Sequence, residues 1–277
     1  MIDTVLFDMG GTLEDIHVDD ESRHASIQGV LDILRAHGID PDKDFETAAS
    51  AINAGWERYG AYRDPRQREL KPEEIWGSFV LTDFGLDEET VRPYAEELAH
   101  MWEVTHYHRA LRPHVREMLE GLKDLGMKLG VISNTASLYQ VFDILKEYGI
   151  RDYFQDVTLS SVTGYRKPNP NIFMVSLHQV QSDPAHCAYV GGDYYFTYGN
   201  TLFMMLNTQD TNAAEHKQFM EQAIAANPNC TWRVVTLHQD IYGSAEHSNE
   251  PEITNLRYTL VPYFEANDVD VVLTGHD

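Results

Sequence analysis

The sequence predicts an α/β fold, in which a doubly wound parallel sheet carries an inserted all-helical cap and is followed by a further α/β segment. Short apolar runs end in polar or glycine-rich turns, as where residues 3–8 run into Gly10-Gly11-Thr12. Helical stretches alternate with such runs from about residue 108 onward, which is typical of βαβ units and of a Rossmann-like sheet. From about residue 16 to 107 the apolar spacing is helical and strand signals are scarce.

The individual elements of the first part follow from local signals. The apolar run at 3–8 predicts a buried strand, and helical spacing then predicts four helices, the first ending near Gly38 and the others over 45–59, 73–84 and 88–106. Strands then alternate with helices, the strands over 128–132, 157–159 and 188–190 and the helices over 115–125, 138–148 and 171–180. The carboxyl ends of parallel strands form a common crevice, so functional groups are expected there.

The end of the chain has its own alternating pattern. Two strands separated by Gly199-Asn200 are followed by a helix over 213–225, a strand over 232–238, a helix over 251–267 and a last strand starting at about 269. These strands are apolar enough either to complete the first sheet or to form a separate, small α/β lobe.

Charge and composition exclude some partners and divide the chain. The 277 residues carry a formal net charge of −23, which argues against nucleic acid and anionic membranes as partners. Only three basic residues, Lys217, Arg233 and Arg257, lie beyond residue 193, although the chain has 21. Asparagine shows the opposite bias, so residues 1–193 and 194–277 are expected to differ in origin, with chance fluctuation in a short tail as the alternative.

Nothing in the sequence predicts export or a membrane span. The start, MIDTVLFDMGG, has no basic segment before a long apolar run, and no stretch approaches about 20 uninterrupted apolar residues. Cys187 and Cys230 are far apart and form no metal-type or disulfide pattern. A cytoplasmic protein is expected, and its oligomeric state is left open.

Four chemically active residues follow predicted strands or lie in the loops after them: Asp8, Ser133, Lys167 and Asp193. A carboxylate at a strand end can attack a phosphorus or carbon centre. A hydroxyl and a lysine can hold anionic oxygens, and a second carboxylate can hold Mg²⁺. One such residue is weak evidence for a site, but the ordered set of four favours an enzyme.

The segments VLFDMGGTL, VISNT, GYRKPNPNIF and YVGGD resemble the four ordered motifs of the haloacid dehalogenase superfamily. The resemblance implies a core of residues 1–15 and 108–193 with a cap over 16–107. It also implies that Asp8 is the covalent nucleophile and that Lys167 steadies it and the developing charge. Ser133 and Asn134 would bind the transferred group, and Thr12 belongs to the nucleophile loop. Mg²⁺ would be held by Asp8, the Gly10 carbonyl and Asp193.

Two departures from that pattern bear on activity. Phosphatases of the superfamily usually carry an Asp two residues after the nucleophile as the general acid, and here that position is Gly10. General acid catalysis is worth about 10²–10⁴-fold, so weak phosphatase activity is expected; Glu14 and Asp15 are close by but are expected in a loop. In the fourth motif, Gly192 displaces Asp193 by one position and Tyr198 occupies the place of the usual second carboxylate.

The last 84 residues resemble a different family. WRVVTLHQDIYGS and VDVVLTGHD are similar to the C-terminal half of calcineurin-like metallophosphoesterases of the purple acid phosphatase type. By that resemblance His238 and His276 match ligands of a dinuclear metal centre and His247 matches a second histidine that assists the substrate. The segment lacks the family's earlier ligand motifs, so a transition metal at these histidines is not expected.

The sequence therefore predicts a composite chain with a Mg²⁺-dependent hydrolase of the haloacid dehalogenase type. It would act through an aspartyl intermediate at Asp8 on a small phosphorylated or otherwise anionic substrate. Gly10 favours a C–halogen hydrolase as the alternative, because a halide leaving group needs no proton. The altered fourth motif and the incomplete histidine set favour a third possibility, a catalytically impaired binding or structural module.

Overall fold

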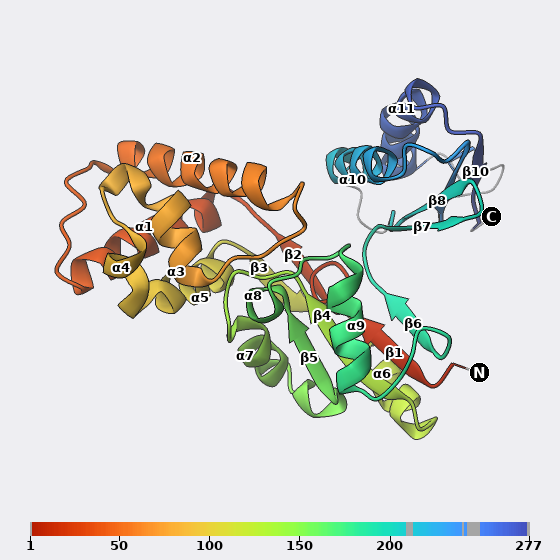
Figure 1. The fold of residues 1–277 in the computed structure, drawn as a ribbon, viewed down its shortest axis with the longest axis horizontal. Helices are drawn as coiled ribbons and strands as arrows, with labels where there is room; N and C mark the ends of the chain where they lie inside the picture. Colours follow the sequence, from red (N-terminus) through yellow and green to blue (C-terminus); the bar gives the residue numbers. More distant parts are fainter. Residues whose placement is uncertain (1, 209–212, 240, 243–249, 276–277) are drawn as a thin grey trace. The chain divides into compact units, whose positions relative to one another are not determined.

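The computed structural model describes residues 2–208, 213–239, 241–242 and 250–275, which form two compact units (Figure 1). The first unit is Met1–Val190 and the second is Gly191–Asp277, so the division falls before Gly191-Gly192 rather than after Asp193. Among the described residues, no helix is both long and apolar enough to cross a membrane.

The first unit is built on a parallel four-stranded sheet in the order β5-β4-β1-β6. All four strands were predicted, and the structure places them at β1 (Thr4–Phe7), β4 (Lys128–Ser133), β5 (Asp156–Leu159) and β6 (Cys187–Val190). β1 pairs with both β4 and β6, so its carboxyl end is central in the sheet. The residue that follows it, Asp8, donates its backbone N–H to the Val190 carbonyl at 2.7 Å.

Helices cover both faces of this sheet, which makes it doubly wound as predicted. Val5 and Phe7 face a core built with α6 (Val115–Asp124) and α7 (Gln140–Glu147). Leu6, on the opposite face of the same strand, packs with residues of α9 (Pro170–Gln179). Two short helical segments, α8 (Ser160–Thr163) and a 3₁₀ turn at Arg151–Tyr153, complete this core.

The cap is a helical domain with its own hydrophobic core. Its helices are α1 (Asp20–Ala36), α2 (Phe45–Arg63), α3 (Pro72–Ile75), α4 (Glu88–Val91) and α5 (Ala95–Thr105). The predicted helices over 73–84 and 88–106 are each broken. The first continues from α3 as a π-helical turn at Trp76–Val80 and a 3₁₀ turn at Thr82–Phe84, and the second changes to a 3₁₀ turn at Arg92–Tyr94. Pro93 accounts for the second break, because proline has no N–H to donate within a helix.

The predicted all-helical insertion over 16–107 begins two residues too early, because Ile16 and His17 are strand residues. Residues Glu14–His17 form β2, which pairs antiparallel with β3 (His108–Leu111), so the chain enters and leaves the cap through a two-stranded ribbon. Glu14 and Asp15 are therefore strand residues, not loop residues. Each strand has four residues and an irregular polar pattern, and ion pairs of Glu14 with Arg109 and of Asp15 with Arg112 connect them.

Three polar side chains on one face of α5 connect the cap to the core. Glu96, His100 and Glu103 lie four and three residues apart and share one helix face. Glu96 accepts hydrogen bonds from the Ser137 hydroxyl at 2.6 Å and the Leu138 N–H at 2.9 Å. Glu103 accepts from the Ala136 N–H at 3.1 Å, and His100 pairs with Asp143 at 3.1 Å. The cap thus contacts the loop that follows β4, at the carboxyl edge of the sheet.

Glu69 forms a second connection between cap and core. Its side chain is fully buried and bonded to the Tyr59 hydroxyl, to the Ser160 hydroxyl at 2.8 Å and to the Arg166 guanidinium. The Glu69 N–H also donates to the Gly164 carbonyl at 3.1 Å. These contacts hold the core loop that contains Lys167.

The second unit forms its own sheet in the order β10-β9-β8-β7 rather than adding strands to the first. Its strands are β7 (Tyr194–Tyr198), β8 (Thr201–Leu206), β9 (Trp232–Leu237) and β10 (Val271–Leu273), with α10 (Ala213–Ala226) and α11 (Pro251–Ala266) between them. Leu202, Met204, Val235 and Leu237 pack with these two helices in a separate core. The elements predicted for this segment are confirmed, and of the two alternatives the structure shows the separate lobe.

We predict that Glu69→Ala lowers the free energy of unfolding of the first unit by about 3–5 kcal/mol, because it leaves the buried Arg166 charge without its partner. Chemical denaturation measures this loss. Glu97→Ala is the matched control, since Glu97 pairs with His37 in a half-exposed ion pair and its removal should cost less than about 1 kcal/mol. Equal losses in the two variants would contradict the role assigned to Glu69.

Candidate active site

Asp8 and Lys167 form a mostly buried ion pair at the carboxyl end of β1. Their side chains are 20% and 12% exposed, and Lys167 Nζ contacts Asp8 Oδ1 directly. The same Asp8 oxygen accepts the Met9 N–H at 2.7 Å. The structure therefore brings together the two residues that the sequence predicts as nucleophile and cationic partner.

Two groups at the end of β4 hold Lys167 in place. Its ammonium donates to the Ile132 carbonyl at 2.9 Å. The Asn134 side chain accepts the Lys167 N–H at 2.8 Å and donates to the Lys167 carbonyl at 3.2 Å. The Asn134 amide is thus occupied in positioning the lysine loop.

Burial controls the charge state of this pair. Desolvation lowers the pKa of Lys167, and the negative charge of Asp8 acts in the opposite direction. Arg166 also lowers the Lys167 pKa, but its own charge is paired with Glu69. Asp8 therefore helps to keep a buried ammonium charged.

Tyr189 on β6 is a member of this site that sequence reasoning missed. Burial, followed by the negative charge of the nearby Asp8 carboxylate, raises the pKa of Tyr189 well above its usual value. Lys167 Nζ lies 5.9 Å from the centre of the tyrosine ring, and Phe173 packs edge-on against the ring. The only available signal was an aromatic residue next to the last position of a strand that adjoins β1.

The remaining predicted residues of the first unit lie along the same edge. Ser133 is the last residue of β4 and is buried. Gly10 and Thr12 belong to the turn that follows Asp8, in which Gly11 has a φ of +74° that favours glycine. The Thr12 hydroxyl is buried and has no hydrogen-bond partner among the described residues.

Asp193 belongs to the second unit, where both of its carboxylate oxygens are bonded. Oδ1 accepts the Asn207 N–H at 2.7 Å, and Oδ2 pairs with His216 Nδ1 at 2.6 Å. His216 is 2% exposed, so this is a buried pair within that unit. The contacts of Asp193 seen here are structural ones.

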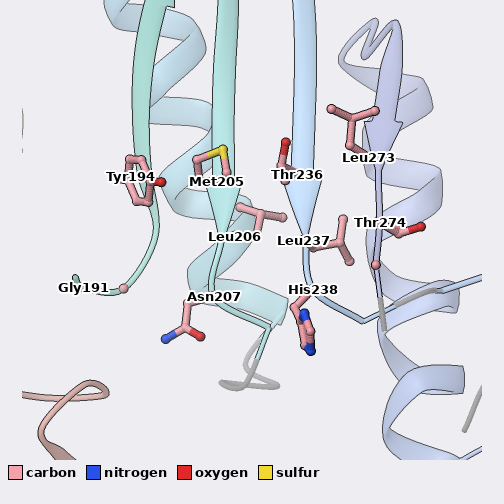
Figure 2. Close-up of a pocket in the computed structure, with 12 residues that line it drawn as sticks. Gly191, Tyr194, Met205, Leu206, Asn207, Thr236, Leu237, His238, Leu273 and Thr274 are labelled. Carbon is pink, nitrogen blue, oxygen red and sulfur yellow. The ribbon is translucent and has the colours of Figure 1, made fainter. Parts of the chain in front are cut away.

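A pocket of about 480 Å³ lies at the carboxyl ends of β8, β9 and β10 and the start of β7 in the second unit (Figure 2). A row of neighbours in register, Tyr194, Met205, Thr236 and Leu273, crosses the sheet beside it. Asn207 and His238 lie just beyond the ends of β8 and β9. The other two predicted histidines, His247 and His276, lie outside the described residues.

The described lining of this pocket does not fit a dinuclear metal centre. His238 is its one strong metal ligand among the described residues, whereas two metal ions need four to six ligands each. The sequence does contain one Asp-x-His triplet, Asp15-Ile16-His17, but it lies on β2 of the first unit. No catalytic step is therefore assigned to this pocket.

Comparisons with known proteins agree with a chain of two parts. The profile of haloacid dehalogenase-like hydrolases matches residues 2–194, and that of calcineurin-like phosphoesterases matches residues 137–277. The chain belongs to the haloacid dehalogenase-like hydrolases and includes, in its C-terminal part, a region of the calcineurin-like phosphoesterase family.

Individual relatives match about six to seven tenths of the chain. Haloacid dehalogenase-like hydrolase domain-containing protein 3 of Bos taurus is 30% identical over 179 residues, which is 59% of this chain and 66% of that protein. Glyceraldehyde 3-phosphate phosphatase of Methanopyrus kandleri is 27% identical over 192 residues, covering 69% of this chain and 76% of that protein. A solved phosphatase of the same superfamily from Thermococcus onnurineus is 19% identical, with coverage of 98% and 93% and a TM-score of 0.42.

We predict that Asp8→Asn changes how stability depends on pH. The variant loses the charge that opposes desolvation, so the Lys167 pKa falls further below its usual value of 10.5. Between the folded-state pKa and 10.5 the unfolded chain binds more protons than the folded chain, so the free energy of unfolding rises with pH.

That rise should be steeper in Asp8→Asn than in the wild type, as measured by urea unfolding between about pH 7 and pH 10. The double variant Asp8→Asn with Lys167→Met is the control and should lose the additional slope. Identical slopes in the wild type and Asp8→Asn would show that the two charges are not coupled.

Proposed function

We propose that this protein is a phosphatase-like hydrolase in which Asp8 is the nucleophile and small phosphorylated molecules are the substrates. The observation that carries the proposal is the ion pair of Asp8 with Lys167 at the end of the central strand. Membership of the hydrolase family and the phosphatase names of several relatives support it.

In the proposed first step, an Asp8 carboxylate oxygen attacks the phosphorus atom of a phosphate ester. The bond from phosphorus to the ester oxygen breaks, the alkoxide leaves with the electron pair and takes a proton from water, and an aspartyl phosphate remains. Water then attacks that phosphorus, which releases inorganic phosphate, a proton and free Asp8. Lys167 offsets the negative charge that accumulates during both steps.

The groups around Asp8 have distinct proposed roles. Ser133, at the end of β4, would donate to an oxygen of the transferred group, as would Thr12, whose hydroxyl has no partner among the described residues. Asn134 would act through Lys167, since its amide is bonded to the lysine backbone on both sides. Tyr189 would hold the nucleophile in one orientation.

Oxygen donors near Asp8 fit a weakly held Mg²⁺. The first unit offers the Asp8 carboxylate and the Gly10 carbonyl, and Mg²⁺ is commonly held by one or two carboxylates, substrate phosphate and several waters. When bound, the ion would reduce the repulsion between the carboxylate and an anionic substrate. Asp193, the third ligand expected from the sequence, would first have to give up its contacts with His216 and Asn207.

A C–halogen hydrolase is the second candidate, and Gly10 is the observation that favours it. With glycine at this position, no carboxyl group two residues after Asp8 can protonate a leaving alcohol. In the halogen reaction Asp8 attacks carbon and the halide departs with its electron pair, so no proton is needed. Glu14 does not replace the missing acid, because it is fully buried and held by Arg109 and Tyr148.

For the second unit we propose no catalytic metal. Of the described residues around its pocket, only His238 is a strong metal ligand, so transition metals should not be retained tightly there. We propose instead that this unit has a binding or structural role.

We predict Mg²⁺-dependent hydrolysis of a chromogenic phosphate monoester by the full chain and its reduction to background in Asp8→Asn. Asp15→Asn is the matched control, because Asp15 is exposed on β2 and pairs with Arg112, and it should retain wild-type turnover. Metal-independent release of halide from a haloacid, lost in Asp8→Asn, would support the second candidate instead. No turnover of either substrate would support the third possibility, a binding or structural module.

A further inference from the structure

The ribbon through which the chain enters and leaves the cap ends in a pair of histidines. His17 on β2 lies directly opposite His108 on β3, and their rings stack with centres 4.8 Å apart. Asp19 follows two residues after His17, and its Oδ1 atom lies 3.1 Å from His108 Nε2. His17 and Asp19 are exposed and the His108 side chain is 42% exposed, so the three side chains meet at the surface of the ribbon.

These side chains offer one ligand atom each within a small volume. The three atoms lie within 4.8 Å of one another, and no other group of three such residues meets this condition in the described part of the chain. Ligand atoms around a tetrahedral Zn²⁺ lie about 3.3 Å apart, given bonds of about 2.0–2.2 Å. Modest rotations of these side chains would bring the three ligand atoms from within 4.8 Å of one another to the spacing of about 3.3 Å that Zn²⁺ requires.

The type of donor selects the type of metal. Imidazole nitrogen suits zinc and neighbouring transition metals, whereas Mg²⁺ and Ca²⁺ are bound through oxygen. The Asp19 carboxylate is already held in place by hydrogen bonds from the Ser22 N–H at 2.8 Å and from His108 at 3.1 Å. Two imidazoles and one carboxylate leave the fourth tetrahedral position to water.

We propose that His17, Asp19 and His108 form a Zn²⁺ site at the neck of the cap. The site is separate from the Asp8 centre in its residues and in its metal, and it does not depend on the proposed phosphatase activity. It joins the strand that enters the cap to the strand that leaves it.

Binding of Zn²⁺ at this site would also affect α1, the first helix of the cap. Asp19 is the N-cap of α1 and accepts the Ser22 N–H at 2.8 Å through the same Oδ1 atom. A metal ion shared by Asp19 and His108 therefore ties the start of α1 to β3. Zinc binding should reduce opening of the ribbon and leave the cores of both units unchanged.

Isothermal titration of the full chain with Zn²⁺ tests the site. The wild type should bind one Zn²⁺ per chain at this site, and His17→Ala and His108→Ala should each weaken binding by about tenfold or more. Two controls should leave binding unchanged. His186→Ala removes a histidine from another exposed His–Asp pair, which joins His186 and Asp183 at 2.9 Å, and His238→Ala removes the predicted histidine of the second unit.

Hydrogen exchange supplies a readout that activity does not affect. Zn²⁺ should slow exchange of amides over 14–17 and 108–111 in the wild type and not in His17→Ala, whereas Mg²⁺ at the same concentration should have no effect. Binding that is unchanged in His17→Ala and His108→Ala, or that is lost in His238→Ala, would overturn the proposal. Because the ribbon histidines are exposed, the metal-free variants should keep the wild-type unfolding temperature, and this shows that any loss of binding is local.

Discussion

The arrangement of the first unit depends on the ion pair of Asp8 and Lys167. Placing two charges at a mostly buried strand end costs desolvation energy, which only close pairing and further hydrogen bonds offset. The Met9 N–H and the Ile132 carbonyl supply those bonds. Met9 follows β1 and Ile132 lies on β4, so the pair requires these two strands to be in register.

The lysine loop needs support from the cap as well as from the core. Arg166 adjoins Lys167 and would depress its pKa further, but the buried Glu69 neutralises that arginine. Glu69 belongs to the inserted domain, and α5 of the same domain binds the loop after β4 through Glu96 and Glu103. Cap and core are therefore joined by polar contacts around the carboxyl edge of the sheet.

Much of this arrangement could be predicted because it follows from local patterns. Buried strands such as β1 are continuous apolar runs, and glycines mark the ends of the helices, so the order of the elements could be predicted from the sequence. The pairing of β2 with β3 could not be predicted from the sequence, because short polar strands are stabilised by each other rather than by their own sequences. Tyr189 was missed for a similar reason: only the folded sheet brings its hydroxyl to Asp8. Asp193 matched a motif, yet its two carboxylate oxygens bond within the second unit.

The central claim is that Asp8 becomes covalently phosphorylated, and trapping that intermediate tests it most directly. Borohydride reduces an aspartyl phosphate to homoserine, which mass spectrometry of peptides can locate in the chain. Incubation with a phosphate monoester and Mg²⁺, followed by rapid quenching and reduction, should convert Asp8 and no other aspartate. Turnover of the ester without conversion at Asp8, or conversion of a different residue, would contradict the account.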